Sequence, residues 1–236
     1  MRMETVAIVL AGGMAKRMEG RLKHLLPIPG NPEQPLTQTP LGRLILQLQN
    51  AGVGDIRIAA GENTKALQEY LAAHGIKNIP VFSAARQIGG RTDWKFVYGE
   101  LAKQIKPGQR GLFVYGDNIY KDSTITALAR RAKQARKPFE VFWSFDLIGK
   151  KGKKPGMVDE TGWTADKRTL EGFAKKGNPF SRYKGVRYVR FLKHAATHRT
   201  GVRLSKPVIN LNNPKQYQAA QRELKRRPWQ VKTKRK

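Results

Sequence analysis

Apolar positions along the first 145 residues alternate between short continuous runs and longer stretches in which they recur every three or four residues. Residues 5–11 (TVAIVLA) are almost wholly apolar and rich in β-branched side chains. This composition predicts a strand that is covered on both faces. Residues 41–50 place four aliphatic side chains on one helical face, and the AGVG that follows predicts the end of that helix.

Strands and helices continue to alternate along this part of the chain. The pattern predicts strands at 55–61, 78–84, 110–117 and 138–145, and helices at 63–75, 93–105 and 123–137, with Ser123 as the cap of the last. Such alternation is typical of an α/β protein: a three-layer α/β/α sandwich around a mostly parallel mixed sheet with right-handed crossovers. Ligands of these sheets bind at the carboxyl ends of the strands.

The second part of the chain has a different pattern of apolar positions. Periodicity is weak between about 148 and 204, and residues 206–224 then predict a strand, an Asn-Asn-Pro turn and a helix with Pro214 in its first turn. We expect one domain over residues 1–224, with a basic tail over 225–236. Trp229 in that tail has two interpretations, an aromatic that stacks on a base or meets a membrane surface, and a packed C-terminal anchor.

The positive charge of the chain also lies mostly in its second part. Residues 1–100 contain 12 lysines and arginines against 8 acidic residues, whereas residues 101–236 contain 34 against 9, and the whole chain has a formal charge of +29. A positive field of this size attracts polyanions such as nucleic acid, nucleotides or an anionic membrane. Solubility is the alternative explanation for the excess, because charge alone is an unspecific signal.

The chain contains no cysteine. This excludes disulfides, thiolate metal sites and a thiol nucleophile, and it fits a reducing compartment. The first apolar run is too short for a membrane span and is interrupted by glycine. We therefore expect a soluble, cytoplasmic protein without a membrane span.

The first strand ends in two glycines, and two cations follow on the same connection. Gly12 and Gly13 allow a tight turn that brings backbone N–H groups against a ligand. Arg17 and Lys23 add positive charge, so the stretch suits a triphosphate, whose charge must be balanced and whose leaving group must be stabilised. The alternative is an ordinary turn at a strand end with surface charges.

A second chemical feature is the YGDN segment after the predicted strand 110–117. It places Asp117 at the edge of the sheet, and a carboxylate there is a hard oxygen ligand of the kind that Mg²⁺ uses together with substrate phosphates and water. A Gly-Asp turn without any metal is the alternative, because such turns are common.

The N-terminal segments resemble a known signature. VLAGGMAKRM (9–18) and LKHLLPIPGNP (22–32) are similar to the start of nucleotidyltransferases with the glycosyltransferase-A-type, Rossmann-like fold, which include the sugar-1-phosphate nucleotidylyltransferases and the molybdenum-cofactor nucleotidyltransferases. The positions that match are Leu10, Ala11, Gly13, Arg17, Met18, Lys23 and Pro27. The resemblance implies nucleotide binding by the loop of Leu10, Ala11, Gly12 and Gly13. It implies that Arg17 contacts the triphosphate and Lys23 the phosphates around the reacting phosphorus. Ala15, Lys16 and the LK dipeptide depart from the usual pattern.

Two later segments extend the resemblance. FVYGDNIY is similar to the GDN stretch of glucose-1-phosphate thymidylyltransferases, which implies that Asp117 is a metal ligand. VINLNNPKQYQAAQREL is similar to the late family motif, on which Asn212 takes the second metal-ligand position. An Asx-Pro helix start without a metal is the alternative for Asn212.

A glycine pair in the QIGGRTDWKF segment is a weaker candidate. Gly89 and Gly90 lie where relatives carry a glycine-containing loop beside the base and ribose. An ordinary turn before a helix is the alternative.

The resemblance implies a Mg²⁺-dependent nucleotidyltransferase that moves a nucleoside monophosphate from an NTP to a phosphorylated acceptor, a sugar 1-phosphate in the simplest case, with release of pyrophosphate. Residues 148–204 would then form the acceptor side. Two alternatives stay open: a glycosyltransferase of the same fold that uses a nucleotide sugar, and a repurposed domain that binds nucleic acid through its basic C-terminal part. Neither the base, the acceptor nor the oligomeric state follows from the sequence.

Overall fold

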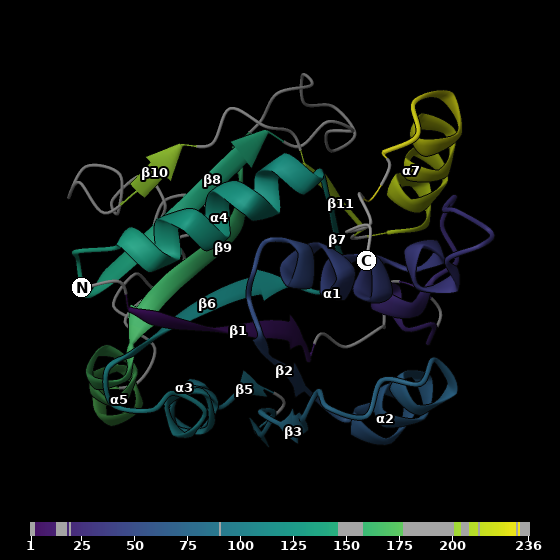
Figure 1. Cartoon of the computed structure of the whole chain (residues 1–236). Helices are drawn as coiled ribbons and strands as arrows, with labels where there is room; N and C mark the ends of the chain where they lie inside the picture. The colour runs from purple at the N-terminus through teal and green to yellow at the C-terminus, as the bar shows by residue number, and fades with distance from the viewer. Residues whose placement is uncertain are drawn as a thin grey trace.

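A seven-stranded sheet in the order β10-β8-β9-β6-β1-β2-β3 forms the centre of the molecule (Figure 1). The computed structural model of the chain describes residues 3–12, 18, 20–89, 91–145, 158–176, 201–203, 208–211, 213–229 and 231. In chain order the strands of this sheet are β1 (Glu4–Ala11), β2 (Asp55–Ala60), β3 (Val81–Ser83), β6 (Gln109–Tyr115), β8 (Phe139–Phe145), β9 (Val158–Asp166) and β10 (Gly201–Arg203).

The sheet is mixed and mostly parallel, as the sequence predicted. β1 pairs in parallel with both β2 and β6, β2 pairs in parallel with β3, and β8 with β10. β9 lies between β6 and β8 and is antiparallel to both. The parallel half of the sheet therefore brings the carboxyl ends of β3, β2, β1 and β6 to one edge.

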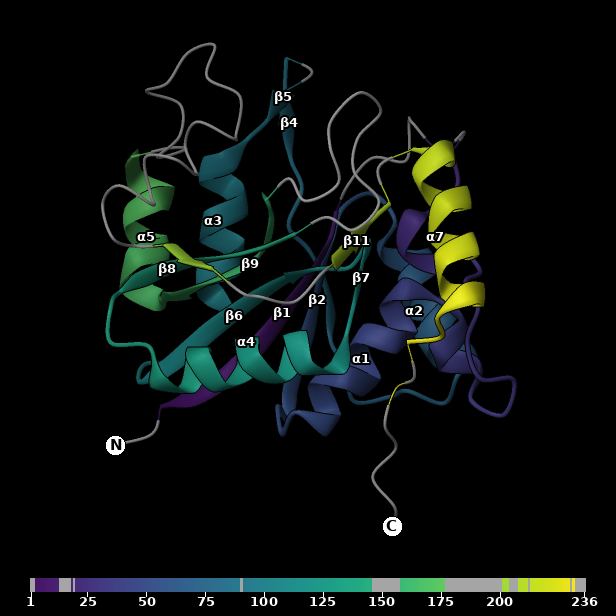
Figure 2. The same cartoon turned by 90° about the horizontal axis from the view of Figure 1, so that it is seen from above.

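Helices cover both faces of the sheet, which confirms the three-layer arrangement (Figures 1 and 2). On one face α1 (Pro40–Asn50), α2 (Thr64–Ala73) and α4 (Asp122–Gln134) pack into the larger apolar core. On the other face α3 (Trp94–Lys103) and α5 (Lys167–Lys176) enclose a second core. β1 contributes to both apolar cores, because its alternate side chains point to opposite faces of the sheet. The side chains of residues 6–9 are wholly buried.

A smaller unit is attached beside the carboxyl edge of the sheet. β7 (Asn118–Tyr120) pairs antiparallel with β11 (Val208–Asn210), and α7 (Pro214–Arg226) packs over them. Their apolar cluster consists of Ile28, Ile119, Ile209, Leu211, Ala220, Leu224 and Trp229. Trp229 is therefore a packed anchor, the second of its two interpretations, and α7 continues two residues into the segment predicted as a tail.

Several predicted boundaries and elements differ from the structure. Ser123 is not the cap of α4: the helix begins at Asp122 after Lys121, and no side chain caps it. The short elements η2 (Lys23–Leu25), η3 (Pro35–Gln38), β4 (Gln87–Ile88) and β5 (Arg91–Thr92) have no periodic signal. β9 and α5 fall in the stretch where periodicity was weak, and β9 is defined by pairing with two neighbours rather than by its own pattern.

Candidate active site

A cavity of about 760 Å³ opens at the edge where β1, β2, β3 and β6 end. It is lined by the ends of these strands, by η2, by the base of the β4–β5 hairpin and by one side of α3. Five residues that the sequence analysis singled out are among its lining: Leu10, Ala11, Gly12, Lys23 and Asp117. The parallel strands converge at this edge, as the general rule for such sheets predicts.

Lys23 and Asp117, which are 94 positions apart in the chain, form an ion pair in this cavity. The Lys23 Nζ donates to Asp117 Oδ2 at 3.4 Å, and the two side chains retain only 13% and 27% of their possible exposure. A cation and a carboxylate that are partly shielded from water interact more strongly than a surface pair. The cavity therefore offers fixed charges of both signs at one point.

Backbone hydrogen bonds position Asp117. Gly116 N donates to Leu10 O at 3.0 Å, which ties the end of β6 to the end of β1. A Cβ at Gly116 would lie 3.2 Å from Val9 Cγ1, so this close approach favours glycine. Leu211 N donates to the main-chain oxygen of Asp117 at 3.3 Å, so the residue that follows β11 is held beside the backbone of Asp117. Arg17, Gly13, Gly90 and Asn212 themselves lie outside the described residues.

Two glycine backbones lie against each other where β1 and β2 end. A Cβ at Gly61 would lie 2.8 Å from Gly12 O, a distance that real Cβ atoms do not show. Gly12 follows β1 and Gly61 follows β2, so the parallel strands approach this closely because both positions lack a side chain. Gly12 was predicted from the sequence and Gly61 was not, although Gly61 has the stronger steric requirement.

His24 is a further residue of this site that sequence reasoning missed. It is 3% exposed, lines the cavity next to Lys23, and its Nε2 has no hydrogen-bond partner. Burial, and secondarily the neighbouring charge of Lys23, lower the pKa of His24 from 6.5 to about 4. The imidazole is therefore neutral at pH 7. The only sequence signal was its place beside Lys23.

The far wall of the cavity is formed by the β4–β5 hairpin and α3. At the base of the hairpin Arg86 donates to Asp93 Oδ2 at 2.8 Å through Nε, and Asp93 Oδ1 accepts from Phe96 N at the start of α3. The Arg86 hydrogen bond is the main reason that the pKa of Asp93 is lowered. Trp94 lines the cavity with 43% of its surface exposed. Gly89, with a φ of +56°, lies in the hairpin turn and is not part of the lining.

The chemistry of the donors suits a divalent cation that arrives with a nucleotide. Within the described ranges no three His, Asp or Glu side chains gather into a metal-binding group. Asp117 is a hard oxygen donor in the cavity beside Lys23. Mg²⁺ is commonly bound through one or two carboxylates plus substrate phosphates and water, so a single carboxylate at this position fits that ion.

Several solved structures have the same fold as this chain. A Bacillus anthracis protein described as a glucose-1-phosphate thymidylyltransferase, in complex with sucrose, has a TM-score of 0.65 at 16% identity, covering 93% of this chain and 94% of its own. HddC from Yersinia pseudotuberculosis, complexed with GMP-PN, has a TM-score of 0.64 at 13% identity, with 94% and 100% covered. A protein from Mycobacterium tuberculosis H37Rv has 0.62 at 18%, with 94% and 99% covered.

Sequence comparison identifies the family. No curated protein sequence gives a significant match. None of the described helices is long and apolar enough to cross a membrane. Residues 7–144, more than half of the chain, match the model of the MobA-like NTP transferase domain, and this segment contains the carboxyl ends of the strands that form the cavity, together with Gly12, Lys23 and Asp117. The chain therefore belongs to the MobA-like NTP transferase family and is a nucleotidyltransferase.

Proposed function

We propose that this nucleotidyltransferase transfers a nucleoside monophosphate from an NTP to a phosphorylated acceptor, with a sugar 1-phosphate as the substrate class, and requires Mg²⁺. The observation that carries the proposal is the ion pair of Lys23 with Asp117 in a cavity at the carboxyl ends of parallel strands. The family supplies the nucleotide as one substrate. The likeness in fold to the protein described as a glucose-1-phosphate thymidylyltransferase supports the choice of acceptor.

In the proposed reaction an oxygen of the acceptor phosphate attacks the α-phosphorus of the NTP. The bond from that phosphorus to the bridging oxygen breaks, and pyrophosphate leaves with the electron pair. No covalent intermediate with the protein is needed. Positioning of the two phosphates and neutralisation of their charge supply the acceleration.

Lys23 has the central role among the described residues. Its ammonium is held at the cavity by the hydrogen bond to Asp117. We assign to it the phosphates around the reacting phosphorus, where it balances negative charge as the leaving group departs. We assign the same function to Arg17 on the loop that precedes it, as the family resemblance implies.

Asp117 would hold the divalent ion, with Asn212 as its second protein ligand. When bound, Mg²⁺ supplies charge neutralisation on the phosphates. The hydrogen bond from Leu211 N to the main-chain oxygen of Asp117 supports this pairing, because it ties the residue before Asn212 to the backbone of Asp117. An amide as the second ligand lowers the negative charge of the site relative to two carboxylates.

The nucleobase would lie toward β3 and α3. Asp117 follows β6 and Ala84 follows β3, and between them lie β1 and β2. Neighbouring strands are about 4.8 Å apart, so these two walls are about 14 Å apart along the edge. That length accommodates a nucleoside with its phosphates at Lys23 and its base beside Trp94, whose exposed indole offers a surface for stacking.

The proposal is tested by pyrophosphate release from each of the four NTPs against a panel of sugar 1-phosphates, with and without Mg²⁺. We expect one combination to react and chelation to abolish the reaction. Asp117→Ala should lower turnover at least a hundredfold with an unchanged circular dichroism spectrum.

Asp55→Asn is the matched control. Asp55 also pairs with a cation, Arg57 at 3.0 Å, but it begins β2 at the opposite edge of the sheet. This variant should retain full activity. Turnover near the unmodified level in Asp117→Ala, or sugar transfer from a nucleotide sugar without pyrophosphate release, would overturn the proposal.

A further inference from the structure

Cations are concentrated on two helices of one side of the molecule. Residues 121–137, which contain α4, carry six lysines and arginines and one carboxylate; residues 214–229, which contain α7, carry five and one. Both carboxylates are engaged, because Asp122 accepts a hydrogen bond from Gln47 at 2.8 Å and Glu223 pairs with Arg226 at 2.9 Å. We call this surface the basic face: Lys121, Arg130, Arg131, Lys133, Arg136, Lys137, Lys215, Arg222, Lys225, Arg226 and Arg227.

The cations of α4 project from the molecule because of the pattern of its apolar side. Ile125, Leu128, Ala129 and Ala132 are buried against the sheet, which turns the opposite side of the helix to solvent. Arg130 and Arg131 of α4 and Arg136, two residues after it, are exposed, and no carboxylate of the described chain pairs with any of them. Like charges this close destabilise one another unless an anion compensates them.

α7 also has cations on one side and buried apolar residues on the other. Lys215, Arg222 and Lys225 fall on one side of the helix, because their spacing of seven and three residues matches whole turns. The opposite side carries Leu224 and Ala220 into the core. α7 therefore presents a line of positive charge roughly 15 Å long, since a helix rises 1.5 Å per residue.

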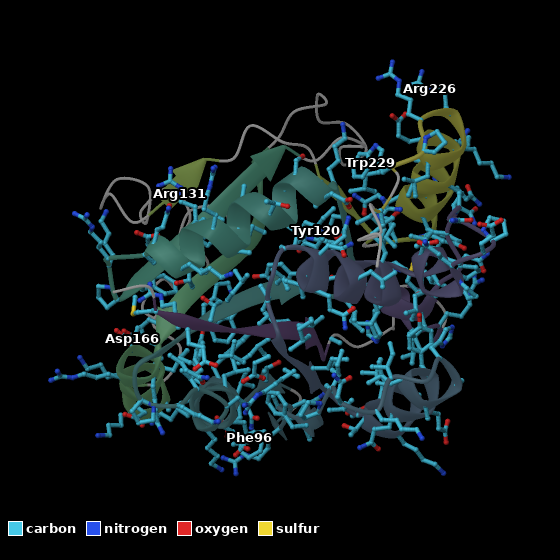
Figure 3. The ribbon with its side chains drawn as sticks, in the orientation of Figure 1. Phe96, Tyr120, Arg131, Asp166, Arg226 and Trp229 are labelled. Atoms are coloured by element: carbon cyan, nitrogen blue, oxygen red, sulfur yellow. The ribbon has the colours of Figure 1, made fainter. Side chains whose placement is uncertain are left out.

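One contact joins the two helical segments. The ammonium of Lys121, the residue before α4, lies 5.1 Å from the ring centroid of Trp229, three residues after the end of α7. In Figure 3 the labelled Arg131 and Arg226 project on the upper side of the molecule, whereas Phe96 of α3 lies on the lower side. The basic face is also distinct from the cavity: α4 starts near the carboxyl edge of the sheet and runs back, so residues 130–137 approach the other edge.

We propose that the basic face binds the phosphate backbone of nucleic acid. Exposed lysines and arginines in rows suit a polymer with regularly spaced phosphates, and such contacts release counterions from it. A membrane surface is the weaker candidate, because membrane-bound helices also insert apolar side chains. The large hydrophobic side chains exposed in the described chain are Ile88 and Trp94, on the hairpin and on α3, which covers the other face of the sheet.

The test uses the full-length protein and fluorescence anisotropy of a labelled 20-nucleotide RNA and a 20-base-pair DNA between 50 and 300 mM KCl. We expect binding whose logarithm falls linearly with the logarithm of salt concentration. In the triple variant R130Q/R131Q/R136Q affinity at 100 mM KCl should fall at least tenfold. The salt slope should fall by roughly 2, because each lost phosphate contact removes about 0.7 to 0.9.

The matched control is the triple variant R168Q/K175Q/K176Q. It removes the same charge from exposed positions of α5, on the other face of the sheet. Its affinity should change less than threefold, and both variants should keep pyrophosphate release at the unmodified rate. A second variant, K215Q/R222Q/K225Q on α7, should weaken binding as the α4 variant does.

Three results would overturn the proposal: no binding of either nucleic acid at 50 mM KCl, an equal loss in the α4 and α5 variants, or binding to vesicles of phosphatidylserine and phosphatidylcholine but not to nucleic acid. None of these depends on the transferase activity, which is measured separately. The relative affinities for the RNA and the DNA show which nucleic acid the basic face prefers.

Discussion

At the scale of single residues, the site depends on side chains whose environments differ sharply from water. Lys23 and Asp117 share a partly shielded ion pair, and His24 beside them is buried without a partner for its Nε2. Residue types and their spacing indicated Lys23 and Asp117, because a cation after a glycine turn and a carboxylate after a strand suit phosphates and Mg²⁺. His24 could not be found in this way, because its burial follows from packing.

The pKa of His24 predicts a pH dependence of stability. Between about pH 6.5 and pH 4 the unfolded chain protonates this histidine and the folded protein does not, because burial lowers its pKa to about 4. The free energy of unfolding should therefore fall as the pH falls from 7.5 to 5, with a contribution from His24 of about 2 kcal/mol. Urea denaturation of the protein and of His24→Gln at both pH values measures it. The variant should lose less stability on acidification, and equal losses would contradict the assignment.

For the helices and strands, sequence periodicity predicted β1, β2, β3, β6, β8 and the helices α1 to α4 with boundary errors of a few residues, but not α5. β1 and α1 are clear examples, because a covered strand and a one-sided helix leave strong patterns. β9 and the β4–β5 hairpin were missed. β9 contains three charged or hydroxylated residues in its first half and is held by two neighbouring strands. The hairpin is too short for any periodicity.

The start of α7 gives a prediction at this scale. The side chain of Asn213 accepts from Gln216 N at 3.0 Å, and its amide donates to Gln216 Oε1 at 3.1 Å. Replacing it by alanine leaves a helix N–H without its cap, so Asn213→Ala should lower the free energy of unfolding by about 1 kcal/mol. Asn213→Asp keeps an oxygen acceptor and serves as the control in urea denaturation. A similar loss in both variants would show that the cap is not the cause.

At the scale of the whole molecule, the excess of positive charge acts on stability as well as on partners. The formal charge of +29 resides mostly in the second part of the sequence, and the described part of it concentrates on α4 and α7. Self-repulsion of this size opposes the compact state and is weakened by salt. The basic face described above is where we expect an anionic partner to remove that repulsion.

Thermal unfolding should therefore respond to ionic strength. Raising NaCl from 20 to 200 mM should raise the melting temperature, by about 2–4 °C for each kcal/mol of repulsion that is screened. The triple variant R130Q/R131Q/R136Q carries less charge and should respond less, which differential scanning fluorimetry can measure. A melting temperature that is constant or falls with salt would show that repulsion is not a significant term in this protein.

Local sequence patterns were sufficient to predict the layered α/β architecture, the family signature and the edge of the sheet at which the cavity opens. These follow from local patterns: side-chain periodicity, glycine turns and charged residues next to strand ends. The grouping of distant residues at the cavity required the folded chain. Neither the 3.4 Å contact of Lys23 with Asp117, the approach of Gly61 to Gly12 nor the burial of His24 depends on residues that are neighbours in the sequence. Trp229 is a similar case: an aromatic in a cationic tail had two interpretations, and the cluster around Leu224 and Ile119 made it part of the core.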